Sequence, residues 1–303
     1  MDGVIALYKE RGMTSHDCIS RLRKILHTSK IGHTGTLDPN VDGVLPVCIG
    51  QATKISEILM GSGKVYQGEI TLGVAYDTED LDGKIIAQQP VETPLTDQEI
   101  DRALAQLTGD IMQTPPMYSA VKVNGHKLYE YARRGETIHR DPRQIHISRF
   151  NQIKPAIYNP TAQQQTIFFE VACSKGTYVR TLAVDFGKLL NLPAVMSSLT
   201  RIQSGGFQLS QCVTLKQVAD AVADHNLGSV MRSLSEALAG YPGYQMDDSR
   251  WQIILHGGFL DPSISKNRDP IIRMDFEGTT RALYQFDAKR HVYRPYKMFL
   301  NKN

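Results

Sequence analysis

The chain has 303 residues, of which 41% are apolar, and its 34 Lys and Arg against 31 Asp and Glu give a formal net charge of +3. This length and apolar content allow one large domain and a small one, with a core that needs no disulfide. The four cysteines (Cys18, Cys48, Cys173 and Cys212) lie far apart without a CxxC pair, so the sequence indicates neither a disulfide framework nor a zinc knuckle. The start, Met1–Val4, lacks the basic and apolar parts of a signal peptide, and no apolar run approaches the roughly 18 residues of a membrane helix. We therefore expect a cytoplasmic protein that does not enter a membrane.

The weak net charge hides an uneven distribution. Residues 119–149 contain seven Lys or Arg against three acids, residues 77–101 contain eight acids and one lysine, and residues 263–302 contain nine basic residues against four acidic ones. Tyrosines accompany both basic zones, namely Tyr118, Tyr129, Tyr131, Tyr293 and Tyr296. Solvated faces are the simpler interpretation of such runs, but phosphate neutralisation and base stacking require these two side-chain types together. We therefore expect an RNA-binding surface.

The first elements lead into a loop punctuated by glycine. Val4–Lys9 is expected to be a strand, and Thr14–Asp17 has the pattern of a capping box that starts a helix. The loop Gly32–Pro39 follows. Its glycines permit backbone angles that other residues avoid, and Pro39 favours an extended conformation at Asp38. A plain turn is the simpler interpretation of this loop alone, but it can also hold one carboxylate in one direction, so Asp38 is the candidate reacting group.

The next segment alternates between strands and a helix. Lys64–Gly73 places Tyr66 on one face of a strand, and Asp82-Gly83 is a hairpin turn before a second strand at Lys84–Val91. Thr96 to Glu99 has the pattern of another capping box, and this helix is expected to end at Gly109.

Residues 114–142 overlap the first basic zone and contain two consecutive prolines and an Asn-Gly turn. Because prolines stop regular structure, we expect a mobile insertion, with an ordinary hairpin as the alternative. The candidate RNA-binding side chains of the first basic zone are Lys122, Lys127, Arg133, Arg134, Arg140 and Arg143.

The remaining chain divides into the end of a large domain and a small module. The pattern predicts strands at Gln144–Ile153 and Thr166–Ser174, a helix from Val179 onward, and helical segments at Thr214–Ala223 and Ser229–Leu238. After the linker-like Gly240–Gly243, a short helix at Trp251–Leu255 and strands at Ile271–Phe276, Arg281–Asp287 and Val292–Leu300 are expected. We therefore expect a domain at residues 1–240 and a small, mostly β module at residues 246–303.

Three long motifs resemble the TruB family of tRNA pseudouridine synthases. GHTGTLDP at 32–39, continued to Lys54, resembles the active-site signature of that family, and QTPPMYSAVK at 113–122 and GTYVRTL at 176–182 resemble two further segments. The resemblance extends over about residues 3 to 205. It implies the α+β pseudouridine synthase fold, with a mixed, mainly antiparallel sheet and a central cleft. It also implies that residues 114–142 form a thumb-like element that grips RNA and that the C-terminal module binds RNA.

The resemblance also implies the catalytic residues. Asp38 would be the nucleophile, Tyr66 would stack on the target uracil, and Arg180 would pair with Asp38. A guanidinium beside a carboxylate holds it ionised at neutral pH and orients it. Whether Asp38 attacks the ribose or the uracil stays open, since a carboxylate can do either.

Other residues are implied to bind the substrate. His33 would fill the gap left by the extruded uridine, and Leu199 would pack beside the target base. Asp80 would contact RNA or position a neighbour, and Lys9 would approach the site. The simpler interpretations are a loop histidine bonded to backbone, a core leucine, a turn carboxylate and a solvated surface lysine. Tyr178 is a further candidate for substrate binding.

The implied reaction is isomerisation of uridine to pseudouridine at position 55 in the T-loop of tRNA. It involves no redox step, phosphate transfer or net hydrolysis, so we expect no cofactor and no metal. The expected partner is the T-arm of tRNA, and we expect a monomer without an obligatory protein partner. Two alternatives remain: a guide-dependent rRNA pseudouridine synthase, and a tRNA-binding or RNA-folding protein without catalysis.

Overall fold

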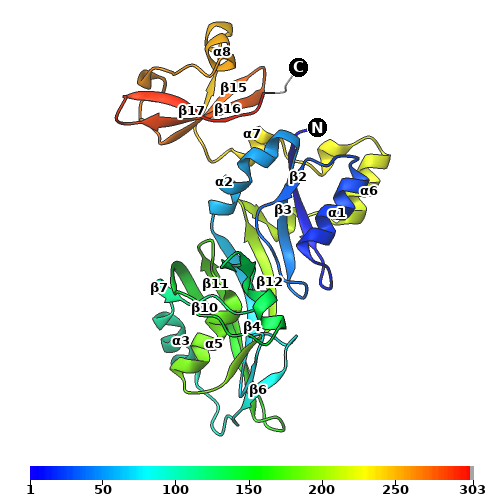
Figure 1. Ribbon diagram of the computed structural model, residues 1–303, viewed down its shortest axis with the longest axis vertical. Coiled ribbons are helices and arrows are strands. Elements are labelled where there is room, and N and C mark those ends of the chain that lie inside the picture. Colours follow the sequence, from blue (N-terminus) through cyan, green and yellow to red (C-terminus); the bar gives the residue numbers. More distant parts are fainter. Residues whose placement is uncertain (301–303) are drawn as a thin grey trace. The chain divides into compact units, whose positions relative to one another are not determined.

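The computed structural model describes residues 1–300, and this part of the chain contains eight α-helices and four β-sheets (Figure 1). It divides into two compact units: the first comprises Met1–Pro39, Val44–Met60 and Gly205–Asn303, and the second comprises Asn40–Gly43 and Gly61–Ser204. Lys302, the last residue of the second basic zone, lies outside the described residues. No helix within residues 1–300 is both long enough and apolar enough to span a bilayer.

The first unit is built around strands that are buried on both faces. β3 pairs with β1 and, antiparallel, with β2. Alternate residues of β1 point to opposite sides, so Val4 and Ala6 enter one apolar cluster while Ile5 and Leu7 enter another. The strands are β1 (Gly3–Lys9), β2 (Ile31–His33), β3 (Asp42–Ile49, whose first two residues belong to the second unit) and the short β13 (Phe207–Gln208).

Helices cover this strand layer, and two of them begin where the sequence predicted a helix start. The side chain of Thr14 caps α1 and that of Thr214 caps α6, each in a capping box, which confirms the helices predicted at both places. In Figure 1 α1 (blue) lies beside α6 (yellow). The predicted helix at Ser229–Leu238 is reduced to α7, because Ser233 caps a new start. The helical segments are α1 (Ser15–Ile25), η1 (Gly50–Ile55), α2 (Ser56–Gly61), η2 (Leu209–Gln211), α6 (Leu215–Ala223), η3 (Leu227–Ser229) and α7 (Leu234–Ala237).

The C-terminal part of the same unit has a four-stranded sheet of its own, in the order β14-β15-β16-β17. β14 runs parallel to β15 and the other pairs are antiparallel. The separate, mostly β module expected from the sequence is therefore present, with its own cluster around Tyr284 and Tyr293. Its elements are β14 (Gly243–Gln245), α8 (Asp248–Leu255), η4 (Pro262–Ile264), β15 (Ile271–Phe276), β16 (Thr279–Asp287) and β17 (Val292–Met298).

The second unit is a sheet in the order β12-β4-β11-β10-β7, whose neighbouring strands all run antiparallel. Asp42 and Gly43 pair in parallel with Thr200 and Arg201 of β12, so the sheet is mixed and mainly antiparallel, as expected. Helix α5 packs along β12 and α3 along β10. The elements are β4 (Lys64–Leu72), α3 (Asp97–Gln106), β7 (Gly109–Gln113), β10 (Arg143–Asn159), β11 (Gln164–Cys173), α5 (Val179–Leu189) and β12 (Ala194–Ser204).

Two hairpins complete the second unit. One joins β5 (Val74–Tyr76) to β6 (Ile85–Gln88), and the other joins β8 (Lys122–Val123) to β9 (His126–Lys127), which leads into α4 (Leu128–Arg133). The second hairpin turns at Asn124-Gly125, where φ is +50° and +83°, so the predicted Asn-Gly turn is confirmed.

Candidate functional site

The loop that carries Asp38 connects β2 to β3, and its backbone is fixed on both sides of the carboxylate. The Oγ of Ser15 accepts a hydrogen bond from the Leu37 N–H at 2.9 Å and donates one to the Leu37 carbonyl at 3.2 Å. The Pro39 carbonyl accepts from the Gly12 N–H at 2.9 Å and from the Lys9 Nζ at 3.0 Å. The half-buried Asp38 therefore lies between two anchored peptide units.

Lys9 is fully buried at the end of β1, which excludes the interpretation of a solvated surface lysine. Its ammonium donates to the carbonyls of Glu10, Met13 and Pro39 at 3.1, 2.6 and 3.0 Å. Carbonyl dipoles that converge on a buried cation offset the loss of its hydration. Lys9 thus reaches the residue next to Asp38. Ser15, to which the sequence analysis gave no role in the site, is a second anchor of the same loop.

His33 ends β2 and is half-buried. Its Nδ1 accepts a hydrogen bond from the Gly35 N–H at 3.2 Å, so in the neutral ring the proton is on Nε2. This contact agrees with the simpler interpretation of His33 as a loop histidine bonded to backbone. Its role in base flipping stays a prediction.

Arg180 lies in the first turn of α5 and is 6% exposed. Its guanidinium donates to the Thr78 carbonyl at 2.8 Å and to the Tyr118 carbonyl at 3.0 Å, and its Nε lies 3.6 Å from Asp80 Oδ2. Two of the sequence-predicted site residues, Arg180 and Asp80, are therefore together. Burial raises the pKa of the Asp80 carboxyl, while the Thr78 hydroxyl and the Arg180 charge act in the opposite direction.

Tyr66 and Leu199 come from the neighbouring strands β4 and β12, and both are largely buried. Leu199 pairs with Gly68, and a Cβ on Gly68 would lie 2.8 Å from the Leu199 Cδ1. The glycine therefore gives Leu199 room on the face that also carries Tyr66. Tyr66, Arg180, Leu199 and Asp80 belong to the second unit, whereas Lys9, His33 and Asp38 belong to the first.

Tyr178 caps α5 and is held by a residue to which the sequence gave no role. The side chain of Gln113 accepts from the Tyr178 N–H at 2.8 Å and donates to the Tyr178 carbonyl at 3.0 Å. Gln113 is 2% exposed. Its place as the first residue of the second motif was the one sequence signal that could have marked it as a site residue. It fixes the entry into the helix that carries Arg180.

The basic zone of the insertion is ordered by contacts between cations and tyrosines. Lys127 and Arg133 lie 5.4 and 5.1 Å from the centre of the Tyr129 ring, and Arg134 lies 4.8 Å from that of Tyr131. Arg134 also pairs with Glu136, and Arg140 donates to the Pro115 carbonyl at 3.0 Å. Lys122 and Arg143 are exposed on β8 and β10.

Two of the tyrosines proposed to stack on RNA bases are unsuited to that task. Tyr293 is fully buried and donates to the Asp269 carbonyl at 2.7 Å, and Tyr131 is 8% exposed and donates to the Val123 carbonyl at 3.2 Å. That part of the prediction is wrong, because a residue interleaved with charges in sequence can still point into a core. Tyr118 and Tyr129 are half-buried, and Tyr296 is 38% exposed.

Within residues 1–300, His, Cys, Asp and Glu side chains form no group of three suited to a metal ion.

The fold matches two solved structures at low sequence identity. A Cbf5-Nop10-Gar1 complex matches with a TM-score of 0.72 at 23% identity, over 98% of this chain and 85% of that one. An H/ACA RNP bound to a substrate RNA containing 2'-deoxyuridine matches with a TM-score of 0.71 at 22% identity, over 99% and 85% of the two chains. These likenesses show the fold, and the match of residues 23–179 to a pseudouridylate synthase family model places the chain in the class of pseudouridine synthases.

Sequence comparison defines the family within that class. The model of the TruB family pseudouridylate synthase N-terminal domain matches residues 23–179, and that of the tRNA pseudouridylate synthase B C-terminal domain matches residues 180–239. Proteins named tRNA pseudouridine synthase B from Levilactobacillus brevis and Pediococcus pentosaceus are 53% and 52% identical over 300 residues, with 99% of both chains covered in each case. The chain belongs to the TruB family of tRNA pseudouridine synthases, and is an enzyme of that family.

Proposed function

We propose that this enzyme converts the uridine at position 55, in the T-loop of tRNA, to pseudouridine, with Asp38 as the nucleophile. The observation that carries the proposal is the double anchorage of the Asp38 loop, through Ser15 to Leu37 and through Lys9 and Gly12 to Pro39. A nucleophile held in this way does not have to be ordered when the substrate binds, which lowers the barrier of the chemical step.

The reaction requires no group outside the polypeptide and the RNA. The bond between N1 of uracil and C1′ of ribose breaks, the uracil turns, and a bond forms between its C5 and C1′. The C5 proton is lost and N1 gains a proton, so atoms and charge balance. Asp38 attacks either C1′ of the ribose or C6 of the uracil, and the same carboxylate leaves when the new bond is complete.

The other site residues support this step in the proposal. Arg180 keeps Asp38 ionised, Tyr66 stacks on the uracil, and Leu199 packs beside it. His33 occupies the gap that the flipped uridine leaves. Tyr178 and Asp80 bind the substrate or position the residues that bind it. Lys9 positions Asp38 through its hydrogen bond to the Pro39 carbonyl.

The basic side chains of residues 114–142 and the adjoining Arg143 are proposed to grip the T-arm. Lys122, Arg133, Arg134 and Arg143 are exposed, as phosphate contacts require. We further propose that the enzyme acts in the cytoplasm as a monomer without a protein partner. The domain boundaries, 1–240 for catalysis and 246–303 for an RNA-binding module, belong to the same proposal.

The decisive experiment measures tritium release from tRNA labelled at uridine C5, with purified protein alone. Wild type is expected to release about one tritium per tRNA, and none from a transcript with cytidine at position 55. Asp38→Asn should still bind tRNA but release none. Release from the cytidine transcript would refute the position, and release by Asp38→Asn would refute the nucleophile. Binding without release by wild type would favour a guide-dependent enzyme or an RNA-folding protein.

A further inference from the structure

Arg180 is held by a short loop, residues 78–80, whose first and last residues contact its guanidinium. Thr78 accepts from the guanidinium through its carbonyl, and Asp80 lies beside it with a carboxylate. Between them is Glu79, whose side chain points instead at the next residue of the helix. The Oγ1 of Thr181 donates a hydrogen bond to Glu79 Oε2 at 2.6 Å.

The backbone of Glu79 is also anchored. Its N–H donates to the Tyr76 carbonyl at 3.1 Å, and its carbonyl accepts from the Met196 N–H of β12 at 3.2 Å. Asp80 adds a bridge to Met196. Residues 78–80 therefore contact α5 at two neighbouring residues, Thr78 and Asp80 at Arg180 and Glu79 at Thr181, and they are bound to β12 through the main chain.

Two features make glutamate energetically unfavourable at position 79, if the only role of the residue is to form a turn. Its φ is +66°, in the left-handed region that favours glycine and asparagine. Burial also raises the pKa of its carboxyl, which the Thr181 hydroxyl and the Arg180 charge oppose. Such strain persists where the surroundings fix the conformation, and it is concentrated at functional sites.

We infer that Glu79 is a positioning residue: by binding Thr181 it holds residues 78–80 against the first turn of α5, and so sets where the Arg180 guanidinium lies. The inference rests on the proposed function, in which Arg180 serves Asp38. Thr181 directly follows Arg180, so the same helical turn carries both contacts. Loss of the Glu79 bond should let the loop and the guanidinium shift together.

The test compares steady-state kinetics of Glu79→Ala, Glu79→Gln, Thr181→Val and Thr181→Ser. A displaced guanidinium should lower kcat about tenfold or more in Glu79→Ala and Thr181→Val, with KM for tRNA unchanged. Glu79→Gln and Thr181→Ser keep an acceptor and a donor, and should keep near wild-type kcat. The double variant Glu79→Ala/Thr181→Val should be no worse than the poorer single variant, because both remove the same bond.

The matched control is Gln163→Ala. Gln163 has a φ of +50° in the same unit, in the connection between β10 and β11, and should leave kcat unchanged. It shows what the loss of a side chain at a left-handed position does by itself. Wild-type kcat in folded Glu79→Ala and Thr181→Val, a raised KM in place of a lowered kcat, or equal damage from Ala and Gln at position 79 would each overturn the inference.

A second readout does not depend on turnover. Hydrogen exchange of the Met196 amide, which binds the Glu79 carbonyl, should accelerate about tenfold in Glu79→Ala and not in Glu79→Gln. Unchanged exchange would show that the side chain does not hold the loop. If the two variants exchange as expected but wild type releases no tritium, the proposed function fails while the anchoring of the loop stands.

Discussion

The ammonium of Lys9 donates a hydrogen bond to the carbonyl of Pro39 at 3.0 Å, across 30 residues of sequence. Since Ser15 binds Leu37 through both N–H and carbonyl, the segment that follows β1 clamps the loop on either side of Asp38. A buried lysine is costly unless its charge is solvated by dipoles, so its presence here indicates that the geometry of this loop matters.

Lys9→Met should therefore impair both folding and activity. Methionine fills a similar volume but leaves the Met13 and Pro39 carbonyls without the ammonium, and we expect a loss of about 1–3 kcal/mol in the free energy of unfolding. Because the loop loosens, kcat should fall by more than tenfold. Urea denaturation and tritium release measure the two effects. Lys24→Met, at an exposed position of α1, is the control, and normal kcat in Lys9→Met would show that the clamp is dispensable.

Arg180→Lys tests whether the charge or the shape of the guanidinium is needed. A lysine keeps the charge but cannot bond to the Thr78 and Tyr118 carbonyls from separate nitrogens as the planar guanidinium does. We expect kcat to fall about a hundredfold with little change in KM, measured by single-turnover tritium release. Arg102→Lys, exposed on α3, should behave as wild type. Full activity in Arg180→Lys would mean that charge alone suffices.

The sequence predicted the elements whose signals are local. The capping boxes at Thr14, Thr96 and Thr214 start α1, α3 and α6, and β15 has the predicted bounds. The strands β3 and β12 were not predicted. β3 is buried on both faces, with Val44 and Cys48 in one cluster and Leu45 and Val47 in the other, so it lacks the alternation that marks a half-buried strand.

The same limit applies to the site. The resemblance to the family implies Asp38, Tyr66 and Arg180 as candidate catalytic residues, and their roles stay predictions. The hydrogen bonds of Ser15 with Leu37 and of Glu79 with Thr181 were found only in the structure, since they join residues 22 and 102 positions apart in the sequence. No local pattern encodes contacts of that kind.

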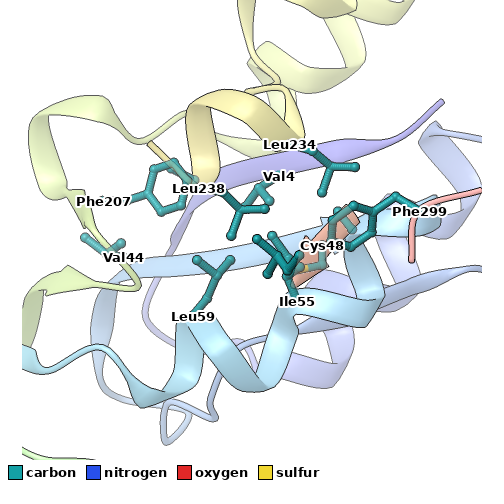
Figure 2. Packing of buried hydrophobic residues seen from close by; sticks show 12 residues of the cluster. Val4, Val44, Cys48, Ile55, Leu59, Phe207, Leu234, Leu238 and Phe299 are labelled. Carbon is teal, nitrogen blue, oxygen red and sulfur yellow. The ribbon is translucent and has the colours of Figure 1, made fainter. Parts of the chain in front are cut away.

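Phe299→Ala should destabilise the first unit as a whole. Phe299 follows β17 and is 4% exposed, and it enters the cluster that contains Val4, Ile55 and Leu234 (Figure 2). Deletion of a buried phenylalanine side chain costs about 3–5 kcal/mol. Guanidinium denaturation should show one transition at lower denaturant, whereas Phe259→Ala, 52% exposed in the same module, should change little. A Phe299→Ala protein with unchanged stability would show that the module contributes nothing to this core.

The stability of Glu79→Gln relative to wild type should depend on pH. Burial is the largest cause that raises the pKa of Glu79 above its usual value of 4.5, with Asp185 acting the same way and Thr181, Arg180 and Lys188 against it. Because its pKa is higher in the folded state, the Glu79 carboxyl contributes stability at pH values below its unfolded pKa. That contribution is lost as pH rises through the folded pKa. Glutamine does not titrate, so Tm of Glu79→Gln minus Tm of wild type should increase from pH 4 to pH 8.

Glu170→Gln supplies the comparison of opposite sign. Hydrogen bonds from Gln67 and then Arg149 lower the pKa of Glu170, so its ionised form stabilises the fold above the unfolded pKa and that stability disappears as pH falls. The Tm of Glu170→Gln minus that of wild type should therefore decrease over the same pH range. Scanning calorimetry of the three proteins at several pH values measures both differences. Parallel curves for all three would mean that neither carboxyl is perturbed by folding, and a decrease for Glu79→Gln would show that the Thr181 bond outweighs the cost of burial.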